Sequence, residues 1–270
     1  GYYQAAGAMV TQFNRLDVIT QNLANVNTIG YKRQDVVIAD FERIFKETRD
    51  ELPLDNHTKD AAKFLARSID RVPNINDVYT DFSAGGLKTS TNALDVAIVR
   101  EDAFLLVQTP AGETRLTKNG ALTLDPDGYI VTKEGYRVLN ADYKALPDNA
   151  RGIQVPNNVQ IAITPNGDVY GDEVQLGRLY IAQPRDLRTL KQEGDNLYIP
   201  AYPEDVTDTE NSGALRQGFV QMSNVNPVTQ MVNLIETQRL GESYQKVMTT
   251  HMKNRKTVLT GSILAIVICG

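Results

Sequence analysis

The sequence contains no tryptophan, one cysteine and two histidines among its 270 residues. The lone cysteine, Cys269, excludes an internal disulfide framework. Neither His57 nor His251 has a second histidine or a cysteine at metal-ligand spacing, which argues against a zinc site. A Gly-x-Ser-x-Gly turn, a P-loop and a dinucleotide-binding glycine motif are also missing. We therefore predict that the chain is not an enzyme and holds no cofactor, metal ion or small-molecule substrate.

Neither sign of charge dominates, and long apolar runs are scarce. The 28 basic and 33 acidic residues are interspersed, with a formal net charge of −5. Nucleic acid is not expected as a partner, because no lysine–arginine cluster is interleaved with aromatic residues. The longest apolar run, residues 258–269, is shorter than the roughly 20 residues that span a bilayer. The amino end lacks the pattern of a cleavable signal peptide, so we expect any export to follow a non-Sec route.

Residues 1–26 show the apolar periodicity of a helix. Six positions alternate at spacings of three and four residues, which gives an a/d seam that is apolar except at its one threonine. Val10, Ile19 and Val26 widen this stripe. A single helix with so broad an apolar face is unstable in water, so we expect another segment to cover it. The six seam positions are Ala6, Met9, Phe13, Leu16, Thr20 and Leu23.

A second, longer helix is predicted from about Asn226. Asn226 is a good N-cap, and Pro227 fits the first helical position, where its missing N–H costs nothing. Two displaced apolar stripes follow, which predicts one neighbour inside the chain and another outside it. Gly241 either is tolerated or marks the close approach of another helix. The stripes consist of Val228, Met231, Val232 and Ile235, and of Leu234, Gly241, Tyr244, Met248 and Met252.

Between the two helices the apolar period shortens to two, which is typical of strands. Turn signals such as Asn119-Gly120 and Asp125-Pro126-Asp127-Gly128 separate the runs. The sequence thus predicts an antiparallel β domain inserted between helical ends, after a charged connector. The predicted strand runs are residues 93–99, 104–108, 129–132, 160–164 and 176–182.

These observations define an α+β fold. We expect the N- and C-terminal helices to pair in a coiled-coil-like bundle, with a mainly antiparallel β domain inserted between them. The predicted divisions are an N-terminal helix at 1–35, an extended connector at 36–86, a β-rich domain at 87–210, and a return segment with the C-terminal helix at 211–270.

One short string recurs at the two helix boundaries. Asn25-Val26-Asn27 closes the first predicted helix, and Asn224-Val225-Asn226 precedes the second. Because asparagine caps helices and tolerates tight turns, we predict that both helices break at the same level; chance recurrence is the alternative. Gly30 follows the first string, and a positive φ is expected there.

Both strings lie in longer motifs that resemble those of flagellar basal-body rod and hook proteins. The amino-terminal motif runs from Asn22 to Arg33, and the carboxy-terminal motif includes residues 215–219, 223–228, 231–235 and 238–239. Central stretches such as residues 94–98, 117–120 and 194–198 are similar too, so the resemblance covers nearly the whole chain. The resemblance assigns assembly roles to Asn22, Leu23, Ala24, Asn25, Val26, Asn27, Thr28, Gly30, Tyr31, Lys32, Ser223, Asn224, Val225, Met231, Ile235, Gln238 and Arg239.

The resemblance implies a structural subunit that the flagellar type III system exports and that polymerises through its terminal helices into a tubular drive shaft in the periplasm. Expected partners are further copies, adjacent rod or hook subunits, the export apparatus and, as a further candidate, the surrounding P/L-ring bushing. Departures at residues 100–104 and at Lys118 favour the proximal (F-type) rod, whereas the long connector resembles the distal (G-type) rod. The alternatives are a distal rod or hook-type subunit, or an exported adhesin with a β domain on a helical stalk.

Overall fold

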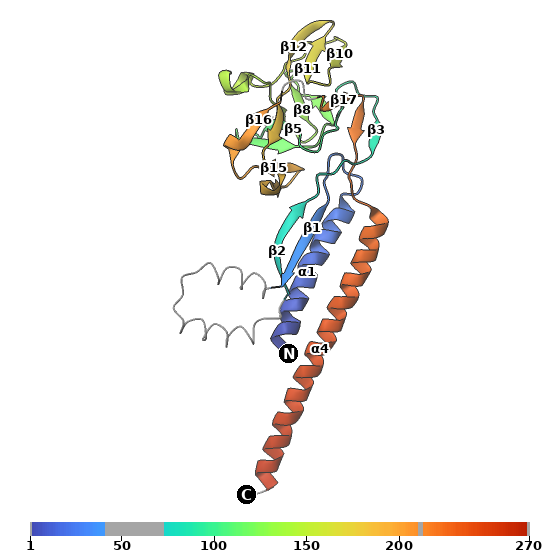
Figure 1. Ribbon diagram of the computed structural model, residues 1–270, viewed down its shortest axis with the longest axis vertical. Coiled ribbons are helices and arrows are strands. Elements are labelled where there is room, and N and C mark those ends of the chain that lie inside the picture. The colour runs from blue at the N-terminus through green and yellow to red at the C-terminus, as the bar shows by residue number, and fades with distance from the viewer. Residues whose placement is uncertain (1, 41–72, 210–212, 269–270) are drawn as a thin grey trace. The chain divides into compact units, whose positions relative to one another are not determined.

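The computed structural model describes residues 2–40, 73–209 and 213–268. Much of the predicted connector therefore lies outside the described residues. The chain divides into two compact units. The first unit comprises Gly1–Leu23, Gln34–Tyr79 and Pro227–Gly270, and the second comprises Ala24–Arg33 and Thr80–Asn226. Figure 1 labels some of the elements of each unit.

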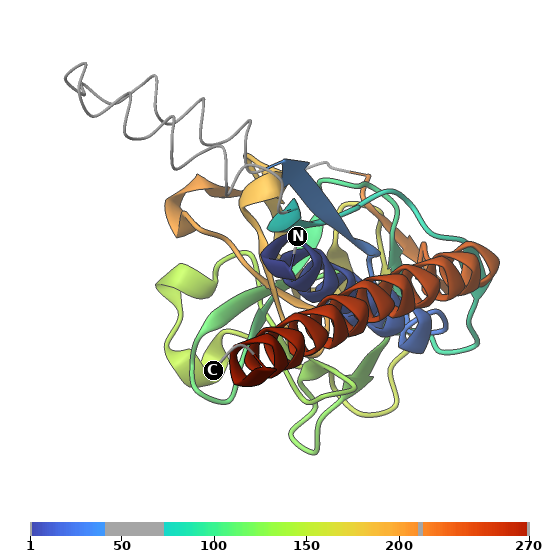
Figure 2. The same cartoon turned by 90° about the horizontal axis from the view of Figure 1, so that it is seen from below.

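The first unit contains two long helices and a two-stranded sheet. Helix α1 spans Tyr2–Ala24 and helix α4 spans Pro227–Ile268, while β1 (Gln34–Asp40) pairs with β2 (Pro73–Thr80). The predicted helix start at Pro227 is confirmed, and α1 ends directly before Asn25. Helix α4 continues for 42 residues without a break (Figure 2). The sequence did not predict β1 or β2, because their mixed, charged segment shows no clear period.

The buried face of α1 differs from the predicted seam. Ala8, Thr11 and Ile19 are buried, whereas the seam positions Phe13 and Thr20 are exposed. The predicted seam therefore does not coincide with the face of α1 that is buried within the described chain. The prediction counted only apolar residues, whereas the buried face also includes polar ones. Within the side chains that the structure describes, the buried positions of α1 are Ala8, Thr11, Gln12, Ile19 and Asn22.

Helix α4 presents two different faces, as its two stripes predicted. Val228, Met231, Val232 and Ile235 are all exposed, whereas Leu234, Tyr244 and Met248 are half-buried. The predicted close approach at Gly241 is absent within the described chain, because a Cβ there would meet nothing within 4 Å. Among the helices that the structure describes, none combines the length and the apolar character needed to cross a membrane.

The second unit is built from antiparallel sheets, as predicted. Its largest sheet has nine strands in the order β14-β15-β6-β5-β9-β8-β7, with β13 and β16 attached through β5. Smaller sheets pair β10-β11-β12, β17-β4 and β18-β3. The strands are β3 (Leu87–Thr89), β4 (Val96–Ile98), β5 (Phe104–Gln108), β6 (Thr114–Thr117), β7 (Leu122–Leu124), β8 (Ile130–Thr132), β9 (Arg137–Val138), β10 (Ile161–Ile163), β11 (Asp168–Gly171), β12 (Val174–Arg178), β13 (Ile181–Pro184), β14 (Lys191–Glu193), β15 (Leu197–Ile199), β16 (Val206–Asp208), β17 (Leu215–Gln217) and β18 (Phe219–Gln221). Short 3₁₀ helices lie at Tyr143–Ala145, Asp148–Ala150, Leu187–Thr189 and Pro203–Asp205.

Most predicted strand runs coincide with observed strands, and residues 104–108 match β5 in full. The run at 176–182 was wrong as one strand, because it divides into the end of β12 and the start of β13. Between these strands the Leu179 and Tyr180 amides donate to the carbonyl oxygens of Gly167 and Leu139. The chain thus passes from one sheet to another at this point.

Strand β5 separates two hydrophobic clusters. Because side chains alternate along a strand, Leu105 and Val107 join one cluster, whereas Phe104 and Leu106 join the other. All five residues of β5 are buried, so it is a central strand covered on both faces. In the second cluster the aromatic rings of Phe82, Phe104 and Tyr198 are in mutual edge-to-face contact.

The adjacent glycines Gly85 and Gly86 should respond oppositely to substitution. A Cβ at Gly85 would lie 1.9 Å from the Met222 carbonyl oxygen, whereas one at Gly86 would meet nothing within 4 Å. We expect Gly85→Ala to lower the free energy of unfolding by about 3 kcal/mol or more. Gly86→Ala, the matched control, should change it by less than about 1 kcal/mol. Urea unfolding measures both, and equal stabilities would contradict the close packing of this turn.

Candidate functional site

Residues from both family-like motifs meet in the second unit. The group consists of Gly30, Lys32, Arg33, Asp81, Ser83, Gln221 and Asn224, and we call it the motif cluster. Its amino-terminal and carboxy-terminal members are about 190 residues apart in sequence, at separations of 189 for Lys32–Gln221 and 191 for Arg33–Asn224. The structure thus shows direct contacts between residues of two motifs that are far apart in the sequence.

Lys32 lies at the centre of the motif cluster and is only 1% exposed. Its Nζ donates to the Ser83 carbonyl oxygen and to Gln221 Oε1, each at 2.8 Å. Burial lowers the pKa of Lys32 from 10.5 to about 8, against the opposing attraction of Asp81 and Glu101. The Lys32 side chain is long, and its ammonium group can donate up to three hydrogen bonds. It therefore links two acceptors that lie in different segments of the chain.

Asn224 joins three further groups of the same cluster. Its Oδ1 accepts from the Arg33 amide at 2.7 Å, and its Nδ2 donates to the carbonyl oxygens of Asp81 and Ser83 at 2.8 and 3.2 Å. Asp81 in turn accepts from Arg33 at 3.0 Å. Burial raises the pKa of Asp81, but hydrogen bonds from Ser83 and the charges of Arg33 and Lys32 outweigh it and lower that pKa overall.

Gly30 holds the motif against the β domain through its backbone. Its φ is +73°, as the sequence predicted, and its amide donates to the Gln221 carbonyl oxygen at 2.8 Å. A Cβ at this position would lie 2.5 Å from the Lys118 carbonyl oxygen and 2.7 Å from Asn119 Cα. Any other residue therefore meets both backbone strain and a steric clash.

Two residues beside the motif cluster were not predicted as site residues. Lys118 is 1% exposed, and its Nζ donates to the carbonyl oxygens of Arg100, Glu101 and Ala103. Burial and the nearby Lys32 charge lower the pKa of Lys118 well below its ordinary value. Asn196, in the left-handed β14–β15 turn, donates from Nδ2 to the Ile29 carbonyl oxygen at 3.1 Å. In the sequence, Lys118 and Asn196 were marked only by lying in the family-like stretches 117–120 and 194–198.

The other predicted assembly residues are not members of the motif cluster. Asn22 belongs to the first unit, where its side-chain amide exchanges two hydrogen bonds with the Gln34 backbone at 2.7 and 2.9 Å. Tyr31 and Val225 are buried, and burial raises the pKa of Tyr31 to about 12. Their assembly roles stay predictions. Four further predicted residues belong to helix α4 in the first unit: Met231, Ile235, Gln238 and Arg239.

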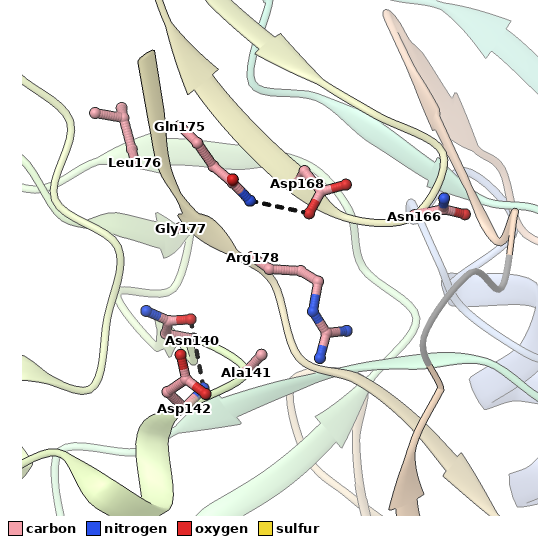
Figure 3. A pocket seen from close by; sticks show the side chains of 9 residues that line it. All are labelled: Asn140, Ala141, Asp142, Asn166, Asp168, Gln175, Leu176, Gly177 and Arg178. Atoms are coloured by element: carbon pink, nitrogen blue, oxygen red, sulfur yellow. Dashed lines mark hydrogen bonds between the residues drawn. The ribbon is translucent and has the colours of Figure 1, made fainter.

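No reacting constellation is found in the described ranges. No three metal-binding side chains gather there. The hollow in Figure 3, of about 620 Å³, contains none of the predicted site residues. Its polar groups satisfy one another or other partners: Asp168 accepts from Gln175 at 3.2 Å, and Arg178 pairs with Asp208. The motif cluster, by contrast, is a set of hydrogen bonds that cross-link distant segments of the second unit.

The burial of Lys32 predicts a pH-dependent stability. The folded protein releases the Lys32 proton near pH 8, whereas the unfolded chain retains it up to about 10.5, so stability should rise with pH between these values. For this one group the rise from pH 8 to 10 is about 2 kcal/mol. Above pH 10 the raised pKa of Tyr31 has the opposite effect, because the unfolded tyrosine ionises first.

Urea unfolding between about pH 8 and 10 tests this prediction. In Lys32→Met, the increase in the free energy of unfolding from pH 8 to pH 10 should be smaller than in the wild type by about 2 kcal/mol. The control Lys133→Met, at an exposed lysine, should keep it. An equal rise in the wild type and in Lys32→Met would show that the buried ammonium is not its source.

Three segments of the chain match known families. Residues 3–32 match the flagella basal body rod protein family, residues 98–171 the flagellar hook protein FlgE/F/G D1 domain, and residues 216–260 the flagellar basal body rod FlgEFG protein C-terminal domain. The first and third matches contain residues from both sides of the motif cluster.

Named relatives match along almost their whole length. The rod protein FlgG of Agrobacterium fabrum is 33% identical, over 91% of this chain and 93% of the relative. The rod protein FlgF of Caulobacter vibrioides is 30% identical, over 91% of each. FlgG of Borreliella burgdorferi is 27% identical, over 92% of this chain and 93% of its own length. With three domain matches in the same order and relatives of this similarity, the chain belongs to the family of flagellar basal-body rod proteins.

Proposed function

We propose that the subunit polymerises through α1 and α4 into a tubular drive shaft after delivery by the flagellar type III export system. As a rod protein the chain is a structural component of the periplasm-spanning basal body and not an enzyme. The proposal adds the mode of assembly: pairing of the terminal helices in a coiled-coil-like bundle, with the β-rich domain at 87–210 attached to it.

The observation that carries this proposal is the exposed apolar stripe at the start of α4. Val228 is 69% exposed, Met231 52% and Ile235 50%. On α1, Phe13 is exposed in the same way. Complete burial of such a side chain stabilises by about 1.5–3 kcal/mol, so contacts with neighbouring copies offer a substantial driving force.

The lengths of the two helices support the same conclusion. At about 1.5 Å per residue, the 42 residues of α4 extend roughly 63 Å and the 23 residues of α1 roughly 35 Å. One copy of α1 is therefore too short to cover α4 along its whole length. Terminal helices of adjacent subunits would cover the remainder.

The choice between rod types is also a proposal. We favour the proximal rod, because the chain departs from the usual family pattern at residues 100–104 and at Lys118. The relatives include both FlgF and FlgG proteins at similar identity, so they do not separate the two types. Adjacent rod and hook subunits are the expected partners, with the export apparatus and the P/L-ring bushing as further proposed contacts.

A charge on the exposed stripe should block assembly without unfolding the subunit. In the double variant Met231→Asp/Ile235→Asp, two carboxylates would have to be buried between subunits, whereas in the free subunit both positions face water. We expect a change below about 1 kcal/mol in the free energy of unfolding, and loss of rods from basal bodies isolated from cells that carry only this variant.

The matched control is Gln245→Asp/Thr249→Asp, which places two charges at the same spacing on exposed polar positions of α4. This control should assemble. Normal rods in the Met231→Asp/Ile235→Asp cells would exclude the stripe as an assembly surface.

A further inference from the structure

Two turns of the second unit hold residues other than glycine in the left-handed backbone region. In the β14–β15 turn, Asp195 has a φ of +58° and Asn196 a φ of +57°. Both side chains are bonded within the unit: Asp195 accepts from the Tyr136 hydroxyl at 2.7 Å, and Asn196 donates to the Ile29 carbonyl oxygen. The strain in this turn thus accompanies contacts that the fold uses.

The β11–β12 turn differs, because one of its two left-handed residues has no such contact. Gly171 pairs with Val174, so the turn consists of Asp172 and Glu173, at φ values of +48° and +70°. The Asp172 carboxylate accepts from the Gln160 amide at 2.9 Å. The Glu173 side chain makes no hydrogen bond or ion pair with the described residues. Val174, which follows it, is 64% exposed.

The local structure gives no reason for a glutamate at position 173. A two-residue hairpin with two positive φ values favours Asn-Gly or Asp-Gly, and a long side chain is strained there. Strained residues are characteristic of functional positions, where a side chain must be presented in one place. The turn holds a carboxylate and an exposed apolar side chain together. We call Asp172, Glu173 and Val174 the hairpin tip.

A surface with matching chemistry lies on strands β17, β18 and β3. Arg216 is exposed, and its guanidinium lies 4.0 Å from the centre of the Phe219 ring. Among the described residues it has no carboxylate partner. Phe219 pairs with Thr89, so Leu87, two residues along the same strand, lies on the same face of the sheet. Leu87 is 42% exposed. We call Arg216, Phe219 and Leu87 the arginine face.

The hairpin tip and the arginine face are complementary in charge and in polarity. Each presents one charged group beside one exposed apolar side chain, and the two charges are opposite. A guanidinium binds a carboxylate through two parallel hydrogen bonds. The Phe219 ring holds the guanidinium and the tight turn holds the carboxylate, so little conformational freedom is lost when they meet. Figure 1 shows the β11–β12 hairpin and β3 at different places in the second unit.

We propose that the hairpin tip binds the arginine face of a second copy of the chain, through an ion pair between Glu173 and Arg216 with Val174 packed against Leu87. The inference rests on the proposed polymerisation, but it requires no particular arrangement of the terminal helices. The tip and the face are different surfaces, so each contact leaves one free tip and one free face. Such a contact continues from copy to copy instead of closing a pair.

An exchange of the two charges tests the ion pair. Glu173→Arg and Arg216→Glu should each lower the number of complete rods, in basal bodies isolated from cells that carry only the variant, by about tenfold, because like charges then meet. The double variant Glu173→Arg/Arg216→Glu should restore the number to within about twofold of the wild type. The controls Asp127→Arg and Lys133→Glu make similar charge changes at exposed positions and should assemble normally. Single variants as harmless as these controls, or a double variant that is not restored, would overturn the proposal.

Glu173→Gly separates assembly from folding. Glycine adopts the turn without strain, so the folding equilibrium constant of the purified subunit should rise by about twofold to fivefold in urea unfolding. The number of complete rods should nevertheless fall by about tenfold, because the carboxylate is missing. A less stable subunit would mean that Glu173 is already bonded in its own copy. That result, or a more stable subunit with normal rods, would refute the proposed contact.

Cysteine cross-linking identifies the partner. In a chain with Cys269→Ser, the pair Val174→Cys/Leu87→Cys should form disulfides between copies in oxidised rods, seen as a ladder of multimers, and none in the dilute subunit. Absence of cross-links in rods, dimers alone, or a cross-link inside the dilute subunit would each contradict the proposal. Failure of the proposed assembly through α1 and α4 is seen separately, as normal rods in Met231→Asp/Ile235→Asp.

Discussion

The second unit depends on the burial of the Lys32 ammonium group. A charge taken out of water is costly, so it persists only where acceptors surround it. Those acceptors come from the segment at Ser83 and from Gln221, which fixes three distant parts of the chain at one point. Lys118 buries a second ammonium group nearby, and it uses carbonyl oxygens in the same manner. A side chain at position 30 would clash with the backbone of Lys118, so only glycine fits there.

Local signals in the sequence predicted the elements well, because those signals act over a few residues. Pro227 sets the start of α4, the strand at 104–108 begins with four consecutive apolar residues, and Gly30 has the expected positive φ. The phase of α1 was missed, since its buried face includes Thr11 and Gln12, whose burial depends on what covers the helix. The run at 176–182 failed for a similar reason: its division in two is set by hydrogen bonds to the carbonyl oxygens of Gly167 and Leu139, which lie outside the run.

The motif cluster was only partly predictable. Resemblance to a family singled out Gly30, Lys32 and Asn224, but it did not show that these residues would touch. Asp81, Ser83 and Gln221 complete the cluster through backbone groups or common polar side chains, which no pattern marks in a single sequence. The burial of two lysines runs against their usual preference for the surface, so only the packed structure reveals it.

The large sequence separation within the motif cluster also sets an order of folding. Most sheet pairings join strands that are near in sequence, such as β5 with β6 and β7 with β8, and these need only short loops to close. The bond between Lys32 and Gln221 closes a loop of 189 residues, whose entropic cost is met only after the intervening sheets have shortened it. We therefore expect the contact that ties the amino-terminal motif to the β domain to be among the last to form during folding.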